Sequence, residues 1–388
     1  MRLAYVCADP GVPVFGTKGS SVHVQEVVRA LRARGALVEL VCARTGGPAP
    51  AGLRDVPVHR LPLATARTTA ERERQLAGHD SAIAGLLARR GPFDLVYERY
   101  SLWSRSATAH AARAGWPCLL EVNAPLVDEQ AVHRELADRA GAEAVIAGAA
   151  SDATAVVCVS DPVAAWVRRQ APAARTVVVP NGVDTGRFRP PRHRPAGPFI
   201  VGFVGTLKPW HGVEVLVDAF ARLAGRLPAA RLLLVGDGPL AGRVTERAAA
   251  LGIGAAVTRT GAVDPLQVPG WLHAMHVAVA PYPAGAETYF SPLKVYEYLA
   301  TGLPVVASSV GQLPAALDHG RAGVLVRPGD VEGLAAALHA LALDPGLRTR
   351  LGAAARARAV QCHSWSGVVA ASLAAAGVAL DPADGAVA

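Results

Sequence analysis

Residues 286–309 read Ala-Glu-Thr-Tyr-Phe-Ser-Pro-Leu-Lys-Val-Tyr-Glu-Tyr-Leu-Ala-Thr-Gly-Leu-Pro-Val-Val-Ala-Ser-Ser and combine a turn, a helix and an apolar strand. Ser291 is a favoured N-cap and Pro292 a favoured first helical residue, so we expect a helix that runs from there through Leu299. The free N–H groups and the dipole at the start of such a helix favour an anion such as a diphosphate. Because Val305–Ala307 is typical of a buried parallel strand, the segment predicts an α/β protein with an anion site beside a strand.

Two charged side chains lie on the same expected helix. Lys294 falls in its first turn, where a cation is normally unfavourable, and a bound anion would remove that cost. Glu297 lies about one turn further along, within reach of a sugar hydroxyl. Thr301-Gly302-Leu303-Pro304 is a stop signal for the helix. The segment therefore has the layout of a nucleotide-sugar site.

The segment resembles the donor-site signature of family 4 of the retaining glycosyltransferases, in its Phe-Ser-Pro-Leu-Lys-x-x-Glu-Tyr form. Further stretches resemble the interdomain junction and the donor domain of that family, namely 179–190, 204–207, 212–213 and 235–239. The resemblance covers most of the chain and is weaker between residues 45 and 90. It implies the GT-B fold, an α/β architecture in which two doubly wound Rossmann-like domains face each other across a cleft.

Strand-length apolar runs alternate with longer amphipathic stretches, which is the pattern of parallel sheets covered by helices. We expect strands at Leu3–Ala8, Leu37–Ala43, Val56–Leu61, Leu95–Tyr97, Cys118–Val122, Ala155–Val159 and Val177–Val179 and, after a Pro-rich linker, at Phe199–Val204, Arg231–Val235, Val257–Thr260, Val277–Ala280, Val305–Ala307 and Val324–Val326. The predicted domains are an N-terminal acceptor domain at 1–185 and a nucleotide-sugar donor domain at 186–363. By the resemblance, a last helix at about 364–380 packs back on the N-terminal domain.

Composition limits the partners. The formal charge of +8 permits nucleic acid, an anionic membrane or an anionic small molecule. The arginines are scattered over the expected helices without a basic run, which argues against nucleic acid. The N-terminus lacks the pattern of a signal peptide, and no apolar run is long enough to span a membrane. We therefore expect a cytoplasmic protein, monomer or homodimer, and leave open a peripheral contact with the inner membrane face.

The five cysteines show no Cys-x-x-Cys spacing, so we expect them to be buried core thiols in a reducing compartment.

The loop Gly205-Thr206-Leu207-Lys208-Pro209-Trp210-His211-Gly212 follows an apolar strand, and its backbone can approach a phosphate closely. Relatives usually carry Arg and Lys at positions 206 and 211, so we expect Lys208 and Lys294 to supply the charge on the diphosphate. A plain strand–helix loop with a solvated Lys208 stays an alternative. The resemblance implies a nucleotide-binding set of Gly19, Gly205, Thr206, Lys208, Gly236, Gly261, Ser291, Leu293, Lys294 and Glu297.

The acidic pair of the family is only half present. By resemblance Glu297 hydrogen-bonds the nucleotide ribose, but Tyr289 stands where relatives carry the glutamate that touches the transferred sugar. Glu287, displaced by two positions, is a sugar ligand or a solvated loop acid. We take Glu287, Tyr289 and Phe290 as substrate-binding candidates and leave the donor sugar open.

Polar residues in the N-terminal half provide the remaining candidates. The loop 16–23 resembles the one that closes over donor phosphate and acceptor, and His23 is either catalytic or an ordinary first-turn residue. Arg99, Asn123 and Glu129 follow strand ends and are acceptor-side or active-site candidates, with a structural hydrogen bond as the alternative for each. The predicted catalytic set is Lys208, Lys294, Asn123 and His23.

The predicted activity is retaining transfer of a hexosyl unit from a nucleoside-diphosphate sugar, UDP rather than GDP, to a hydroxyl of a small-molecule, lipid-linked or glycan acceptor. The resemblance implies same-face attack assisted by the departing phosphate. No Asp-x-Asp or His/Cys cluster indicates a metal, and we expect no cofactor. An epimerase acting on UDP-N-acetylhexosamine and a non-catalytic nucleotide-sugar binding protein are the alternatives on the same fold.

Overall fold

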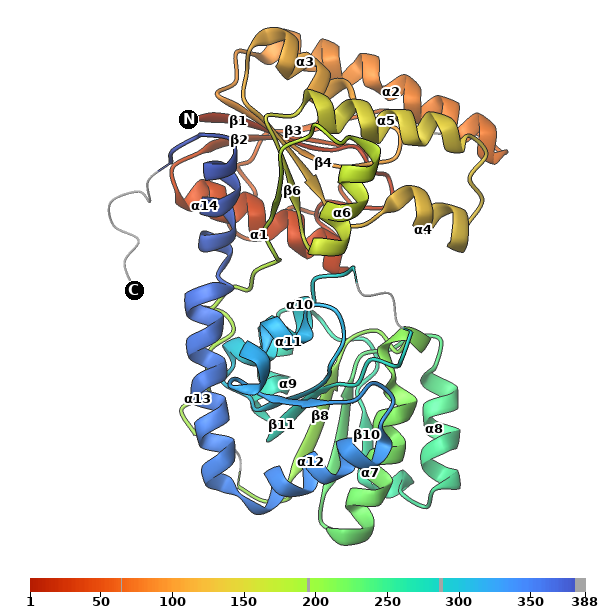
Figure 1. Cartoon of the computed structure of the whole chain (residues 1–388), viewed down its shortest axis with the longest axis vertical. Coiled ribbons are helices and arrows are strands. Elements are labelled where there is room, and N and C mark those ends of the chain that lie inside the picture. The colour runs from red at the N-terminus through yellow and green to blue at the C-terminus, as the bar shows by residue number, and fades with distance from the viewer. Residues whose placement is uncertain (64, 194–195, 286–288, 381–388) are drawn as a thin grey trace. The chain divides into compact units, whose positions relative to one another are not determined.

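The computed structural model describes residues 1–63, 65–193, 196–285 and 289–380. Its contacts divide the chain into two units. Of the described residues, the first unit contains 1–181, 289–291 and 365–380, and the second contains 182–285 and 292–364 (Figure 1). Each unit has its own parallel sheet and its own core, so each is an α/β domain by itself.

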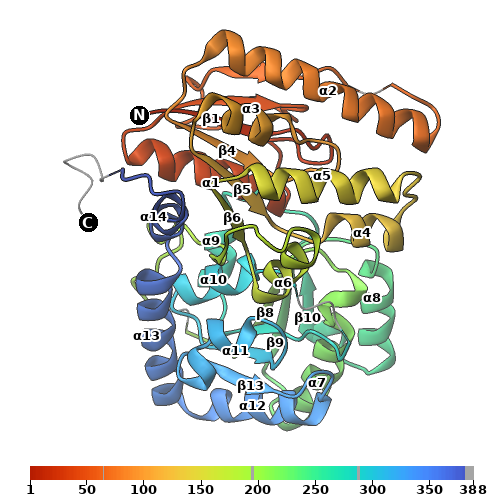
Figure 2. The same cartoon turned by 45° about the horizontal axis from the view of Figure 1, so that its top comes forward.

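The first unit contains a seven-stranded parallel sheet in the order β3-β2-β1-β4-β5-β6-β7. The strands are β1 Arg2–Cys7, β2 Leu37–Cys42, β3 Val58–Arg60, β4 Leu95–Arg99, β5 Cys118–Val122, β6 Ala155–Cys158 and β7 Thr176–Val178. The helices are α1 Gly19–Ala33, α2 Thr69–Arg90, α3 Ser106–Ala114, α4 Leu126–His133, α5 Arg139–Asp152, α6 Asp161–Gln170 and α14 Trp365–Ala375. In Figure 2, α2 and α3 lie on one side of β1 and β4 and α1 on the other. The last helix, α14, packs against α1.

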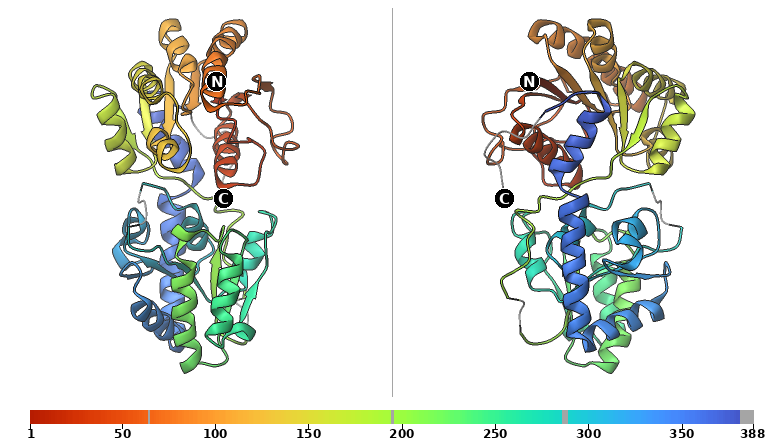
Figure 3. Two further views of the ribbon diagram at one scale, coloured as in Figure 1. Left: turned by 90° about the vertical axis from the view of Figure 1, so that its right-hand side faces the viewer. Right: turned by 60° about the vertical axis from the view of Figure 1, so that its left-hand side comes forward.

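The second unit contains a six-stranded parallel sheet in the order β10-β9-β8-β11-β12-β13. The strands are β8 Ile200–Val204, β9 Arg231–Val235, β10 Val257–Arg259, β11 Val277–Ala280, β12 Val305–Ser308 and β13 Val324–Val326. The helices are α7 Val213–Arg226, α8 Ala241–Ala250, α9 Val268–His273, α10 Leu293–Ala300, α11 Leu313–Ala316, α12 Val331–Leu343 and α13 Pro345–Cys362. In Figure 3, α13 is the long dark-blue helix, and it packs against α10.

Two doubly wound halves are confirmed, and each expected strand is present. Apolar runs marked the strands well because parallel strands are buried on both faces. Two expectations are wrong. α10 begins at Leu293 with Pro292 at its cap position, so Ser291 does not cap it. Cys362 is exposed at the end of α13, whereas the other four cysteines are buried in strands.

The long helix α2 lies between residues 45 and 90, where the resemblance to the family is weaker. Its start carries a capping box, in which the Thr68 hydroxyl accepts from the Glu71 N–H and the Glu71 carboxylate accepts from the Thr68 N–H. The Thr-x-x-Glu spacing of Thr68 and Glu71 is present in the sequence and predicts such a helix start. No helix in the described part of the chain is both long and apolar enough to cross a bilayer.

Candidate functional site

Two glycine turns follow β8 and β9 in the second unit. Gly205 and Gly236 have φ angles of +139° and +132°, which L side chains rarely adopt. Gly205 donates its N–H to the carbonyl of Val235 at 2.9 Å, and Gly236 bridges to Gly261. A Cβ atom on Gly236 would lie 2.2 Å from the Gly205 carbonyl oxygen. At Gly205 and Gly236 the turns therefore carry no side chain. They lie at the carboxyl ends of the strands, where ligands of open parallel sheets bind.

Lys294 projects from the first turn of α10 to these glycine turns. Its Nζ lies 4.5 Å from the ring centroid of Phe203 and 5.6 Å from that of Tyr282. It is shielded from solvent and has no hydrogen-bond partner among the described residues. A buried ammonium costs free energy unless it is paired, and two aromatic faces compensate only part of that cost. The site is therefore prepared for an anion.

Burial changes the protonation of two basic side chains at this site, Lys294 and His211. Burial lowers the pKa of Lys294 to about 7, although Glu297 opposes that shift. Burial, with the nearby charge of Lys294 adding to it, lowers the pKa of His211 to about 4. His211 is therefore neutral at pH 7, and its Nδ1 lies in hydrogen-bond contact with the Thr206 carbonyl. Positive charge at this loop comes from lysines.

Lys208 belongs to the same loop and is half-buried. Its Nζ is 4.5 Å from the ring centroid of Trp210, whose side chain is 49% exposed. The whole chain has three lysines, Lys18, Lys208 and Lys294, against a large excess of arginine. Each of the three lies in a segment predicted to contact donor phosphate: Lys18 and Lys208 in loops, and Lys294 in the first turn of α10. The remaining members of the predicted nucleotide set lie as follows: Thr206 is exposed, Leu293 opens α10 and is half-buried, Glu297 is half-buried one turn later, and Gly19 opens α1.

The predicted substrate loop belongs to the first unit. Ser291 uses its hydroxyl to accept the Asn181 N–H at 2.9 Å, which explains why it is not the cap of α10. The Tyr289 hydroxyl hydrogen-bonds the Glu129 carboxylate, and the Tyr289 carbonyl accepts from Ser160. Two residues predicted separately are thus in contact. Phe290 is half-buried beside them, and Glu287 lies outside the described residues.

A polar cluster lies between the sheet and α1 in the first unit. His23 on α1 contacts Glu121 on β5, with 2.7 Å between Nε2 and Oε1. Tyr97 on β4 donates its hydroxyl to the same oxygen at 3.1 Å. Arg99, also on β4, places Nη1 3.6 Å from the other carboxylate oxygen. The sequence reasoning missed Glu121, although a lone acid inside the apolar run Cys-Leu-Leu-Glu-Val signalled it.

The surroundings of this cluster limit what His23 can touch. His23 is 2% exposed, and the Trp365 ring of α14 packs edge-on against it at 5.1 Å between centroids. Arg99 pairs in register with Glu121, and Asn123 follows directly after β5, where it is half-buried. The structure therefore brings together three of the predicted residues, His23, Arg99 and Asn123. Glu129 lies elsewhere, on α4.

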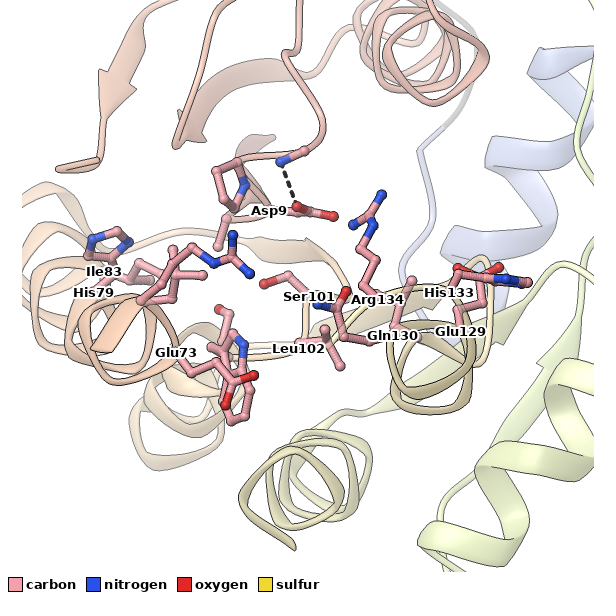
Figure 4. Close-up of a pocket in the computed structure, with 18 residues that line it drawn as sticks. Asp9, Glu73, His79, Ile83, Ser101, Leu102, Glu129, Gln130, His133 and Arg134 are labelled. Atoms are coloured by element: carbon pink, nitrogen blue, oxygen red, sulfur yellow. Dashed lines mark hydrogen bonds between the residues drawn. The ribbon is translucent and has the colours of Figure 1, made fainter. Parts of the chain in front are cut away.

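Glu129 lines a cavity of about 450 Å³ in the first unit, next to the carboxyl ends of β1 and β4 and between α2 and α4. Its lining includes Asp9, His79, Ser101, Trp103, Gln130 and Arg134. In Figure 4, Asp9 and Arg134 lie on the same side of this cavity, whereas Glu73 and His79 come from α2. Asp9 accepts the N–H of Gly11 at 2.7 Å, and Glu73 accepts two N–H groups at the start of α5. The cavity has the size and mixed character of a small-molecule site.

Comparison with known proteins decides the family. Residues 17–187 match the family model described as Glycosyltransferase Family 4, and residues 198–344 match that described as Glycosyl transferases group 1. The D-inositol 3-phosphate glycosyltransferase of Stackebrandtia nassauensis is 30% identical over an alignment of 389 positions. The alignment covers 92% of this chain and 86% of that enzyme. The chain belongs to family 4 of the glycosyltransferases. In this family 4 chain the first matched region contains every strand of the first sheet except β1, and the second contains all strands of the second sheet.

Other relatives of this family 4 glycosyltransferase are more distant or shorter matches. The glycogen synthase of Mycobacterium tuberculosis is 31% identical over 202 residues, and the match spans 47% of that enzyme, about half its length. Among solved structures, sucrose-phosphate synthase of Thermosynechococcus elongatus has a TM-score of 0.72 at 24% identity, covering 95% of this chain and 96% of that one. Anabaena HepE in complex with UDP has a TM-score of 0.71 at 19% identity, covering 95% and 97%. These two structures show that the fold is GT-B.

Proposed function

We propose that this protein transfers a hexosyl unit from a nucleoside-diphosphate sugar, UDP rather than GDP, to a hydroxyl of an acceptor, with retention of configuration. The observation that carries the proposal is the Lys294 ammonium, buried without a hydrogen-bond partner in the described structure, at the glycine turns after β8 and β9. A bound diphosphate would supply the negative charge that this buried ammonium needs as a partner. The choice of UDP draws support from the solved relative that was crystallised with UDP.

The donor residues would act mainly by electrostatics. As the glycosidic bond breaks, charge develops on the leaving diphosphate, and we expect Lys294, Lys208 and the free N–H groups at the start of α10 to stabilise it. Fixed donors of this kind contribute about 10²–10³ in rate each. Glu297 would hydrogen-bond the ribose. We propose same-face attack assisted by the departing phosphate, without a metal or another cofactor.

The acceptor would bind in the first unit. The cavity beside Glu129 offers an aromatic wall at Trp103 and polar groups at Ser101 and Arg134, and its 450 Å³ suits a small acceptor or the end of a lipid-linked or glycan acceptor. Arg99 and Asn123 would serve the transferred group, whereas His23, at 2% exposed, would act on it only through neighbouring side chains. A cavity in the first unit favours a transferase over an epimerase, because an epimerase has no acceptor to bind.

The test is donor binding followed by product analysis. We expect UDP to raise the melting temperature more than GDP does, and we expect Lys294→Met to remove that response. Arg259→Met, an exposed cation on β10, is the matched control and should respond like the wild type. Nucleotide release that depends on an added acceptor supports transfer. A change of sugar configuration without acceptor points to an epimerase, and binding without any turnover points to a binding protein.

A further inference from the structure

Glu121 occupies the centre of the polar cluster on β5. Its Oε1 accepts from Tyr97 at 3.1 Å and contacts His23 Nε2 at 2.7 Å, while its Oε2 faces the Arg99 guanidinium at 3.6 Å. The side chains of Glu121 and His23 are each 3% exposed. One carboxylate thus connects α1, β4 and β5 from inside the unit.

Glu121 is ionised in this position. Burial alone would raise the pKa of Glu121, but the neighbouring His23 and Arg99 lower it below its ordinary value. Buried ionic networks of this kind contribute little net stability, because desolvation of the charges offsets their attraction. What the network does achieve is orientation, since an ionised carboxylate with partners on two other elements leaves each partner few alternative positions.

The outermost member of the cluster is Arg99. It ends β4, pairs in register with Cys7 on β1 and with Glu121 on β5, and its side chain is 11% exposed. Glu121 lies behind it and is too enclosed to touch a substrate. The His23 side chain is as enclosed as that of Glu121, so any effect of Glu121 on the reaction passes through Arg99.

We infer that Glu121 is a positioning residue for sugar transfer: it fixes the Arg99 guanidinium and the His23 imidazole at the carboxyl edge of the first sheet. The inference rests on the proposed function, in which Arg99 serves the transferred group. A guanidinium already oriented does not have to reorganise when charge develops, so the effect of Glu121 belongs to the rate of transfer rather than to donor affinity.

The neighbouring residue on β4 provides a matched control. Glu98 is also a fully buried carboxyl group, but it points to the opposite face of the sheet, where it accepts from Ser104 at 2.5 Å and from the Thr108 N–H at 3.2 Å. Burial raises the pKa of Glu98 to about 8, so it is largely protonated at pH 7 and Glu98→Gln changes little. In the described part of the chain, its carboxyl group makes no hydrogen bond or ion pair with His23 or Arg99.

The kinetic experiment compares Glu121→Gln with Glu98→Gln, using the best UDP-sugar and acceptor found for the wild type. We expect Glu121→Gln to lower kcat about 10–100-fold, the range for groups that orient a functional residue, with the donor KM within about two-fold. Its effect should not multiply with that of Arg99→Gln, because both remove the same oriented guanidinium. Equal kcat values for the two Glu→Gln variants, or multiplying effects, would overturn the inference.

Two further measurements test the inference if Glu121→Gln does not fold or if the proposed function is wrong. Glu121→Asp keeps the charge but withdraws the oxygens from His23 and Arg99, so it should fold and still lower kcat. Proton NMR of the wild type should show a low-field His23 Nε2–H signal that is absent in His23→Gln and moves upfield in Glu121→Asp. A wild type without transferase activity defeats the proposed function alone if this signal is present. An absent signal defeats the inference whatever the activity.

Discussion

The ammonium of Lys294 lies directly at Gly205: a Cβ atom on that glycine would be 3.0 Å from Nζ. A lysine on α10 and a glycine after β8, 89 positions apart in the chain, therefore share one small volume. The site accommodates a buried cation only because the neighbouring turn carries no side chain.

Replacing this cation should stabilise the protein. We expect Lys294→Met to unfold at a higher denaturant concentration than the wild type, because the buried ammonium has no hydrogen-bond partner in the described structure. The folded-state pKa of about 7 lies below the ordinary 10.5, so the unfolded chain binds more protons between those values. The wild type should thus gain stability as pH rises from 7 towards 10, and Lys294→Met should lack that part of the gain. Identical pH dependence in both proteins would contradict the assignment.

Donor binding should take up a proton. Above pH 7 part of the Lys294 population is neutral, and a bound diphosphate favours its charged form. Calorimetry at pH 8 in Hepes and in Tris, which differ in ionisation enthalpy, should give different apparent enthalpies for UDP. Lys294→Arg, permanently charged, is the control: if it binds UDP, its enthalpy should not depend on the buffer. A wild-type enthalpy that is the same in both buffers would count against a titrating Lys294.

Gly236→Ala should abolish nucleotide binding and destabilise the second unit. The added Cβ would lie 2.2 Å from a backbone oxygen at a φ of +132°, a conformation that costs on the order of 1–3 kcal/mol for other residues. Gly225→Ala on α7, with no atom within 4 Å of its Cβ, is the matched control and should be neutral or slightly stabilising. Thermal shifts with and without UDP measure both effects, and similar behaviour of the two variants would refute the close approach.

Activity should survive a chelator. Among the described residues no group of three His, Cys, Asp or Glu side chains is arranged to hold a metal ion, and Lys294 with the helix N–H groups can take that role. Transfer rates before and after EDTA should agree within error. Complete loss of activity that Mg²⁺ or Mn²⁺ restores would overturn this prediction.

Trp365→Ala should destabilise the first unit while leaving the second intact. Trp365 is 6% exposed and packs against His23, and truncation of a buried Trp costs about 3–5 kcal/mol. Hydrogen exchange should report faster opening of β4 and β5 but unchanged protection of β8 and β9. Trp210→Ala, at an exposed position in the second unit, is the control for loss of an indole. Equal loosening of both sheets in Trp365→Ala would contradict this division.

The sequence predicted the architecture because buried parallel strands are continuous apolar runs, and Arg231–Val235 and Val277–Ala280 were placed with both ends correct. It predicted Lys294 because a cation at a helix start needs an explanation. It could not predict that Ser291 would accept from Asn181 instead of capping α10, because that contact joins residues 110 apart. For the same reason Glu121, whose partners come from α1 and β4, was overlooked.

The return of α14 to the first unit has a consequence for biosynthesis. The indole of Trp365 completes the enclosure of His23, whose partner Glu121 is translated 244 residues earlier. The sheet of the first unit can pair its strands early, but the face that α1 shares with α14 must wait until the second unit has been translated. A nascent chain that stalls inside the second unit would present that unfinished face to chaperones.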